Sequence, residues 1–150
     1  MLTKEQIIEA VKSGREGAPL DNRDYKRLIQ FFEPKDWAVF GFTPKEDADK
    51  TFTPKEFTRE NVLEQLKSDV EFGFQKALDR RGISAGLMHC VVAMWMWVLE
   101  DMELSAMFES DDKYPMYGLP CFKAVAVKYG FPNPIGEDVG DERQYCDEDE

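Results

Sequence analysis

The chain has 150 residues, of which 43% are hydrophobic, and its formal net charge is −11 at pH 7. This length supports one domain with a hydrophobic core. The acidic balance argues against direct binding to nucleic acid or to anionic membranes, because phosphate contacts need Lys and Arg side chains.

The first 13 residues predict an amphipathic helix and no secretory signal. Thr3 followed by Gln6 forms a capping box, so the helix should run from Lys4 to about Ser13 and end at Gly14. Charged residues interrupt this segment, so it lacks the apolar core of a signal peptide. The chain also has three widely spaced cysteines that do not form a disulfide framework. We therefore expect reduced thiols and a cytoplasmic protein.

The next segment contains one predicted helix and two ambiguous stretches. A helix from Asp21 to Pro34 is predicted by apolar residues at helical spacing: Tyr25, Leu28, Ile29 and Phe32. Residues 36–42 are aromatic and β-branched, which fits a short strand, although a turn of helix or a packed loop fits equally well. Phe-Thr-Pro-Lys-Glu then occurs at residues 42–46 and again at 52–56. Thr as N-cap and Pro at N1 favour two helix starts over a repeated recognition segment.

Three further helices are predicted in the second half. The first should run from Arg59 to Arg81 and end at Gly82, because apolar residues recur every four positions: Val62, Leu66, Val70, Phe74 and Leu78. The second, from Ser84 to about Met102, contains the longest apolar run, which is marginally short for a membrane span and favours a buried central helix. The third should run from Pro120 to Gly130.

Together these elements predict a compact all-α bundle of about five helices. The helical domain should occupy residues 1–136, and residues 137–150 should form a flexible acidic tail, because they contain few apolar residues.

The negative charge is concentrated in two stretches. Residues 137–150 carry a net charge of −7. Residues 100–112 contain no Lys or Arg and six acidic residues, which we call the acidic ridge: Glu100, Asp101, Glu103, Glu109, Asp111 and Asp112. The remaining residues carry a net charge of about +2, since these two stretches account for −13 of the total of −11. This asymmetry indicates a partner with a basic protein surface.

The leading hypothesis is therefore a non-enzymatic interaction protein that uses the acidic ridge. Its most concrete version is a phage- or mobile-element-type inhibitor of a nucleic-acid enzyme, in which carboxylates occupy the place of phosphates. No catalytic residue, metal or cofactor is predicted. Cys90 lies directly after His89 on the predicted helix, and adjacent helical side chains diverge, so these two cannot form a catalytic pair.

Two other functions remain open. The helix over residues 84–102 is rich in Met and Trp, and such a surface can join two copies of a chain. Alternatively, His89, the only histidine, could act with Cys121 or with acidic residues in a small enzyme.

Overall fold

The computed structural model of the chain describes the following residues: 1–14, 18–19, 22–45, 51–109, 119–134 and 146–147. Its described α-helices are α1 (Lys4–Ser13), α3 (Arg59–Leu78), α4 (Gly82–Leu99), α5 (Met102–Phe108) and α6 (Leu119–Tyr129). Its described 3₁₀ helices are η1 (Asn22–Tyr25), η2 (Leu28–Phe31) and η3 (Pro34–Phe40). The domain is therefore all-α, which confirms the predicted fold class.

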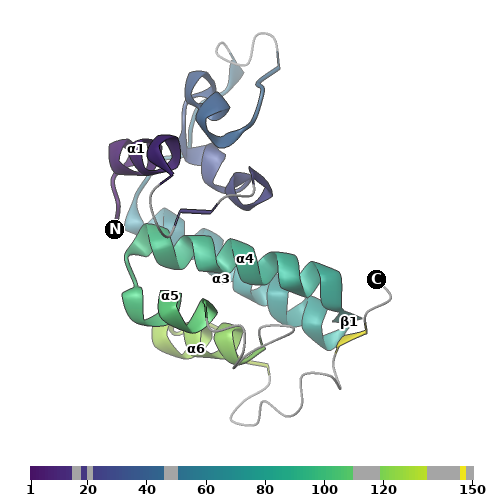
Figure 1. Cartoon of the computed structure of the whole chain (residues 1–150). Coiled ribbons are helices and arrows are strands. Elements are labelled where there is room, and N and C mark those ends of the chain that lie inside the picture. Colours follow the sequence, from purple (N-terminus) through teal and green to yellow (C-terminus); the bar gives the residue numbers. More distant parts are fainter. Residues whose placement is uncertain (15–17, 20–21, 46–50, 110–118, 135–145, 148–150) are drawn as a thin grey trace.

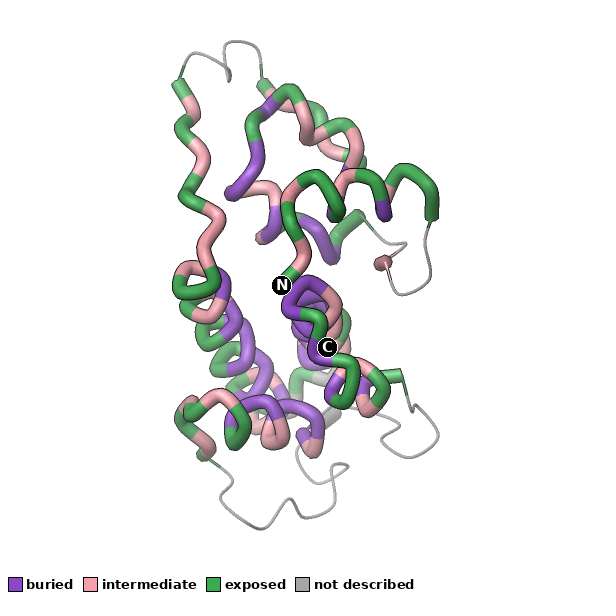
Figure 2. The backbone as a smooth tube through the Cα atoms, turned by 90° about the vertical axis from the view of Figure 1, so that its left-hand side faces the viewer, coloured by how far each residue is buried: buried purple, intermediate pink, exposed green. Residues whose placement is uncertain are grey.

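The helices α3 and α4 form a central antiparallel pair (Figure 1). The helices α5 and α6 cover one side of this pair, and α1 lies at the end where α4 finishes. The N–H of Leu2 bonds to the carbonyl of Val98 at 2.8 Å and joins these two elements. Figure 2 shows that the buried stretches of the helices face one another across the interior. In the part of the chain that the structure describes, no helix is long and apolar enough to cross a membrane.

The capping chemistry of α1 is as predicted. The side chain of Thr3 accepts a hydrogen bond from the N–H of Gln6 at 3.1 Å, and the side chain of Gln6 accepts one from the N–H of Thr3 at 2.9 Å. The helix ends at Gly14, which adopts the left-handed conformation that glycine reaches without steric strain. The buried side chain of Ile7 anchors this helix on the core.

The predicted helix over residues 21–34 is wrong, because 3₁₀ turns replace it. Three aromatic rings converge here: Phe40 lies 5.2 Å from Tyr25 and 5.0 Å from Phe32. The indole N–H of Trp37 donates to the carbonyls of Ile29 and Phe32. Short, tight turns bring these rings together, whereas one continuous helix would space them along its length. Residues 36–40 adopt the turn of helix that was one of the alternatives, and not a strand.

The second Thr-Pro copy does not start a helix, which corrects that prediction. Residues 52–58 are non-helical, and the N–H of Lys55 bonds to the carbonyl of Gln30 at 2.9 Å. This bond holds the segment against η2. The true N-cap is Thr58, whose side chain accepts from the N–H of Asn61 at 3.1 Å. In the first copy, residues 43–45 are non-helical and Glu46 lies outside the described residues.

The connection between α3 and α4 also differs from the prediction. The helix α3 ends at Leu78, and residues Arg80–Arg81 form the two-residue strand β1. This strand pairs in parallel with β2 (Cys146–Asp147). The remaining positions of the predicted acidic tail, 137–145 and 148–150, lie outside the described residues.

The helix α4 is buried around most of its circumference. Five of its buried residues lie within one and a half turns and so point in different directions: Val91, Val92, Met94, Trp95 and Met96. The predicted continuation to Met102 is wrong, because α4 ends at Leu99 and a separate helix, α5, follows.

The helix α6 ends as its sequence predicts. Gly130 has a φ of 76°, and the N–H of Phe131 bonds to the carbonyl of Ala126 at 2.8 Å, as in a Schellman motif. Its start packs tightly on α3 at Gly73. A Cβ atom at Gly73 would lie 2.7 Å from the ring of Phe122, so only glycine allows the two helices to approach this closely.

Candidate functional site

The acidic ridge begins at a sharp corner between α4 and α5. Glu100 ends α4 in the left-handed conformation with a φ of 59°, and its N–H bonds to the carbonyl of Trp97 at 3.0 Å. The N–H of Asp101 bonds to the carbonyl of Met96 at 2.9 Å. These bonds reverse the chain, so that α5 begins at Met102.

Asp101 is a buried structural residue of this corner. Its side chain accepts a hydrogen bond from the N–H of Leu104 at 3.0 Å and so forms the N-cap of α5. Its second oxygen accepts from the hydroxyl of Tyr129 at 2.7 Å and lies 2.8 Å from the ammonium group of Lys128. Asp101 is only 8% exposed, so its carboxylate joins α4, α5 and α6 from the inside.

The charged form of Asp101 is favoured despite its burial. Burial alone would raise the pKa of this carboxyl, but hydrogen bonds from Lys128, from the Leu104 amide and from Tyr129 outweigh it and hold the pKa below its usual range. In turn, burial and the neighbouring Asp101 carboxylate raise the pKa of the Tyr129 hydroxyl, which stays protonated as a donor.

Three ridge residues present their side chains to solvent: Glu100, Glu103 and Glu109. The carboxylate of Glu100 lies 3.2 Å from the terminal amino group of Met1, and its side chain is 54% exposed. Glu103 is in the first turn of α5, and Glu109 follows its last residue. The two remaining ridge residues, Asp111 and Asp112, lie outside the described residues.

The face that holds the corner is mixed in charge. A hollow of about 470 Å³ lies beside the corner, where Arg59 and Lys128 line it together with Glu100 and Glu103. A second hollow of about 460 Å³ shares Glu103 and Lys128 and adds Lys123. Because these bases come from α3 and α6, the sequence of the ridge alone did not reveal them.

Two apolar side chains are unusually exposed on the same face. Met102 is 75% exposed and lines the first hollow, and Val127 is 64% exposed and lines the second. Single exposed apolar residues are common, but here two accompany a concave surface. We call this surface, formed by the corner and the two hollows, the α5–α6 face.

A second buried carboxylate lies between η2, α3 and α4. Asp69 is 2% exposed, and its oxygens lie 2.6 Å from Nε of Arg27 and 2.7 Å from the indole nitrogen of Trp95, which donates to it. The amide of Gln65 donates to Asp69 at 3.1 Å and accepts from the amide of Gln30 at 3.0 Å. This network fixes the positions of the three elements in the core.

The sequence contains a signal for Asp69 that helical periodicity alone does not reveal. The residue lies between Leu66 and Val70 on the apolar face of α3, where a lone carboxylate must find internal partners. Burial raises the pKa of Asp69, and the opposing contacts from Trp95 and Arg27 do not reverse this shift.

His89 lies in aromatic surroundings. Its ring centroid is 4.6 Å from that of Phe108 and 6.3 Å from that of Phe122, and its Nε2 atom is enclosed. The thiol of Cys121 donates to the carbonyl of Met107 at 3.9 Å. These contacts are typical of a packed histidine and a structural cysteine. Among the described residues, no group of three or more His, Cys, Asp or Glu is placed to hold a metal ion.

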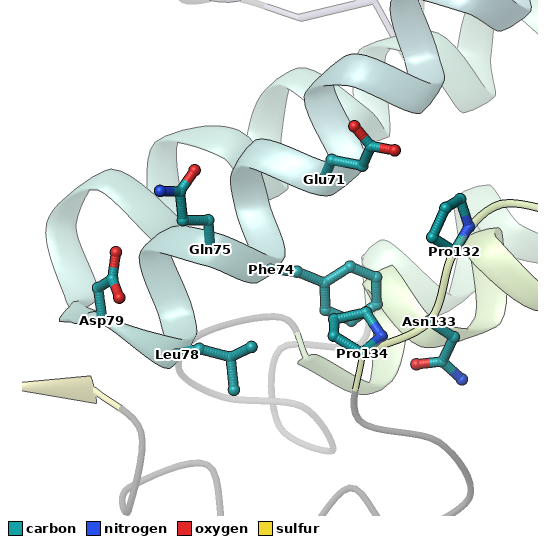
Figure 3. Close-up of a pocket in the computed structure, with 8 residues that line it drawn as sticks. All are labelled: Glu71, Phe74, Gln75, Leu78, Asp79, Pro132, Asn133 and Pro134. Carbon is teal, nitrogen blue, oxygen red and sulfur yellow. The ribbon is translucent and has the colours of Figure 1, made fainter.

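A further hollow of about 460 Å³ lies at the C-terminal end of α3, and we call it the α3 hollow (Figure 3). Phe74 and Leu78 line it from α3, and Pro132 and Pro134 line it from the segment after α6. Figure 3 shows Phe74 and Leu78 extending from α3 and the two prolines on the neighbouring segment. The polar residues that line this hollow are Glu71, Gln75, Asp79 and Asn133.

No protein-family model matches this sequence, and comparisons with curated proteins and with solved structures found no match.

Proposed function

We propose that this protein is a non-enzymatic interaction protein that binds a basic protein surface through the α5–α6 face. The observation that carries the proposal is the corner, where the buried carboxylate of Asp101 fixes the backbone that carries two exposed carboxylates, Glu100 and Glu103. Side chains on such a support lose less conformational entropy on binding than side chains on a mobile segment.

The α5–α6 face is itself mixed in charge, so the preference for a basic partner comes from the net charge of −11 of the whole chain. A strongly acidic protein attracts basic partners over a distance, which speeds association, and it repels nucleic acid. A protein that itself binds nucleic acid carries a basic surface of the kind that an acidic protein attracts. Inhibition of a nucleic-acid enzyme, as in phage or mobile-element systems, is the most concrete version of the proposal.

The other side chains of the α5–α6 face would fix the orientation of the bound partner. Met102 and Val127 offer apolar area that a partner can cover, and apolar contact supplies affinity that charge alone does not. The bases Lys123 and Lys128 would select partners that place acidic groups opposite them.

The proposal is tested by capture of basic proteins from a lysate of the native host. The Glu100→Gln/Glu103→Gln variant removes two corner charges, and Glu5→Gln/Glu9→Gln removes two exposed charges from α1. The α1 variant is a matched control because its net charge is the same. We expect the wild-type protein and the control to retain a common basic partner that the corner variant loses, as quantified by mass spectrometry. Retention by all three proteins would overturn the proposed surface.

The two alternative functions have weaker support. Assembly through α4 was inferred from its Met and Trp residues, but three of its methionines and Trp95 are buried in the core of the single chain. The exposed apolar residues of α4 are Ile83 and Leu87, a much smaller area. An enzyme based on His89 would need a polar environment around an imidazole that instead packs against Phe108.

A further inference from the structure

We propose that the α3 hollow binds an apolar side chain of the partner that has a Lys or Arg two residues away on each side. The inference rests on the proposed function, because it takes the partner to be basic, and it names the sequence pattern that the partner would carry. The α3 hollow lies at the opposite end of α3 from Arg59, which lines the α5–α6 face, so the two surfaces are separate.

The lining of the α3 hollow suits an apolar side chain. Phe74 is buried and its ring lies 5.8 Å from that of Phe122, so this part of the lining is rigid. Proline has a fixed φ, which makes the opposite wall at Pro132 and Pro134 stiff as well. A volume of about 460 Å³ is in the range of pockets that enclose small ligands, and it has room for a Leu, Met or Phe side chain.

The charges around the α3 hollow select a basic segment. Glu71 and Asp79 are exposed, and within the described residues neither carboxylate forms an ion pair. Glu71 lies on α3 and Asp79 is its C-cap, and their separation of eight positions corresponds to about 12 Å along the helix. In an extended peptide, residues two before and two after a central residue are about 13 Å apart. A peptide lying along α3 could therefore insert its central side chain and place a base near each carboxylate.

The strand β2 pairs with Arg80–Arg81 directly after Asp79, but neither strand is part of the lining of the α3 hollow. Charge disfavours two other occupants of the hollow. The chain continues from Pro134 into residues 137–142, which include four carboxylates and no base, so this segment has the same sign as Glu71 and Asp79. A second copy of the chain carries a net charge of −11 and is repelled in the same way. A basic segment of a partner protein is the occupant that combines apolar insertion with charge pairing.

The test uses three fluorescent peptides with the full-length protein, measured by anisotropy at low salt. The first is GRALARG, the second replaces its Leu with Ser, and the third replaces both Arg residues with Gln. We expect GRALARG to bind, and the Ser peptide to bind about tenfold more weakly because it loses the apolar burial. The Gln peptide should be weaker by about fivefold, since exposed ion pairs contribute modestly.

Two protein variants locate the site at which the peptide binds. Glu71→Gln/Asp79→Asn should weaken GRALARG about fivefold. Glu60→Gln/Glu64→Gln removes two exposed charges from the other end of α3 and should leave its affinity unchanged. In NMR spectra of the labelled protein, the peptide should shift the backbone amides of Gln75 and Leu78.

The outcomes separate this inference from the proposed function. Equal binding of the Leu and Ser peptides, or amide shifts that spare Gln75 and Leu78, would overturn the α3 hollow as the binding site. If the host partner is still lost with Glu100→Gln/Glu103→Gln in that case, the proposed function stands. If no basic partner is captured but GRALARG binds as expected, the α3 hollow is supported and the α5–α6 face is not.

Discussion

The two buried aspartates of this protein lie in similar contacts and behave differently. Asp69 in the core and Asp101 at the α4–α5 corner each accept from an aromatic donor and pair with one base. The base of Asp69 is Arg27, whose side chain is 31% exposed, and the base of Asp101 is Lys128, which is 46% exposed. Nevertheless, the pKa of Asp69 is raised and that of Asp101 is lowered.

The opposite directions reflect the balance between burial, which raises the pKa of each carboxyl, and the contacts that lower it. At Asp69 the surrounding apolar residues exclude water, so loss of solvation outweighs a guanidinium group at 2.6 Å. At Asp101 the contacts include the backbone N–H of Leu104, and together with Lys128 and Tyr129 they outweigh burial and keep the charge. The deep aspartate therefore fixes the core, and the shallow one supports an exposed surface.

The largest effect should come from removing the aromatic donor of the deep site. Trp95→Ala deletes a fully buried ring and the donor to Asp69, and it should lower the free energy of unfolding by about 3–5 kcal/mol. Urea denaturation followed by circular dichroism measures this loss. Trp97→Ala removes a half-buried ring and should lower the free energy of unfolding less. Equal losses for the two variants would contradict the central position of Trp95.

The carboxylate of the deep site should have the next largest effect. Asp69→Ala leaves Arg27 and the Trp95 indole without their acceptor, and it should lower the free energy of unfolding by about 3 kcal/mol. Glu64→Ala on the exposed side of α3 is the control and should change it by less than about 0.5 kcal/mol. A loss below about 1 kcal/mol for Asp69→Ala would mean that water reaches the site.

The shallow site should be less sensitive. Asp101→Ala removes the N-cap of α5 and should lower the free energy of unfolding by about 1–2 kcal/mol, because Lys128 can turn to solvent. Tyr129→Phe removes only one hydrogen bond to Asp101 and should lower the free energy of unfolding by about 1 kcal/mol. A loss for Asp101→Ala as large as that for Asp69→Ala would remove the distinction between the two depths.

The pH dependence of stability should show opposite signs for the two aspartates. Asp69 has a folded-state pKa above the ordinary 3.8, so its contribution is present below pH 3.8 and is lost as the pH rises through the folded pKa. Asp101 has a folded-state pKa below 3.8, so its contribution is present above pH 3.8 and is lost as the pH falls through the folded pKa.

Urea denaturation of the Asp69→Asn and Asp101→Asn variants between about pH 2.5 and about pH 7 separates the two effects. Asp69→Asn should remove a decline in stability above pH 3.8, and Asp101→Asn should remove a decline below it. The same slope change in both variants would show that the two pKa values shift in one direction.

The sequence was sufficient for the helices with regular apolar spacing and clear caps. The capping box at Thr3 depends on contacts within one helix, and the apolar repeat after Arg59 has the regular spacing of a helix face that packs on a core, so both can be read from a single sequence. The end of α6 at Gly130 was predictable for the same reason.

The sequence was insufficient where distant contacts choose the local structure. The spacing of Tyr25, Leu28 and Phe32 fits an α-helix, but their packing against Phe40 and Phe57 favours 3₁₀ turns. The start of α5 was missed because Asp101 was interpreted as one more exposed acid of the ridge. An Asp directly before an apolar helical segment is also a common N-cap, and this was the available signal.

The same limit applies to the candidate site. Glu100 and Glu103 were identified from charge alone, and both are exposed. The bases that face them, Arg59 and Lys128, lie 41 or more and 25 or more positions away in the sequence, so nothing local links them to the ridge. The α3 hollow likewise requires the segment around Pro132 to fold back on α3.

The left-handed backbone at Glu100 implies a trade-off between stability and function. A side chain in this conformation costs about 1–2 kcal/mol relative to glycine, which adopts it without strain. Selection for thermal stability alone would therefore replace Glu100 with Gly and remove a corner carboxylate in the same step. A thermostable variant obtained in this way is expected to fold better and, on the proposed function, to bind a basic protein surface less well.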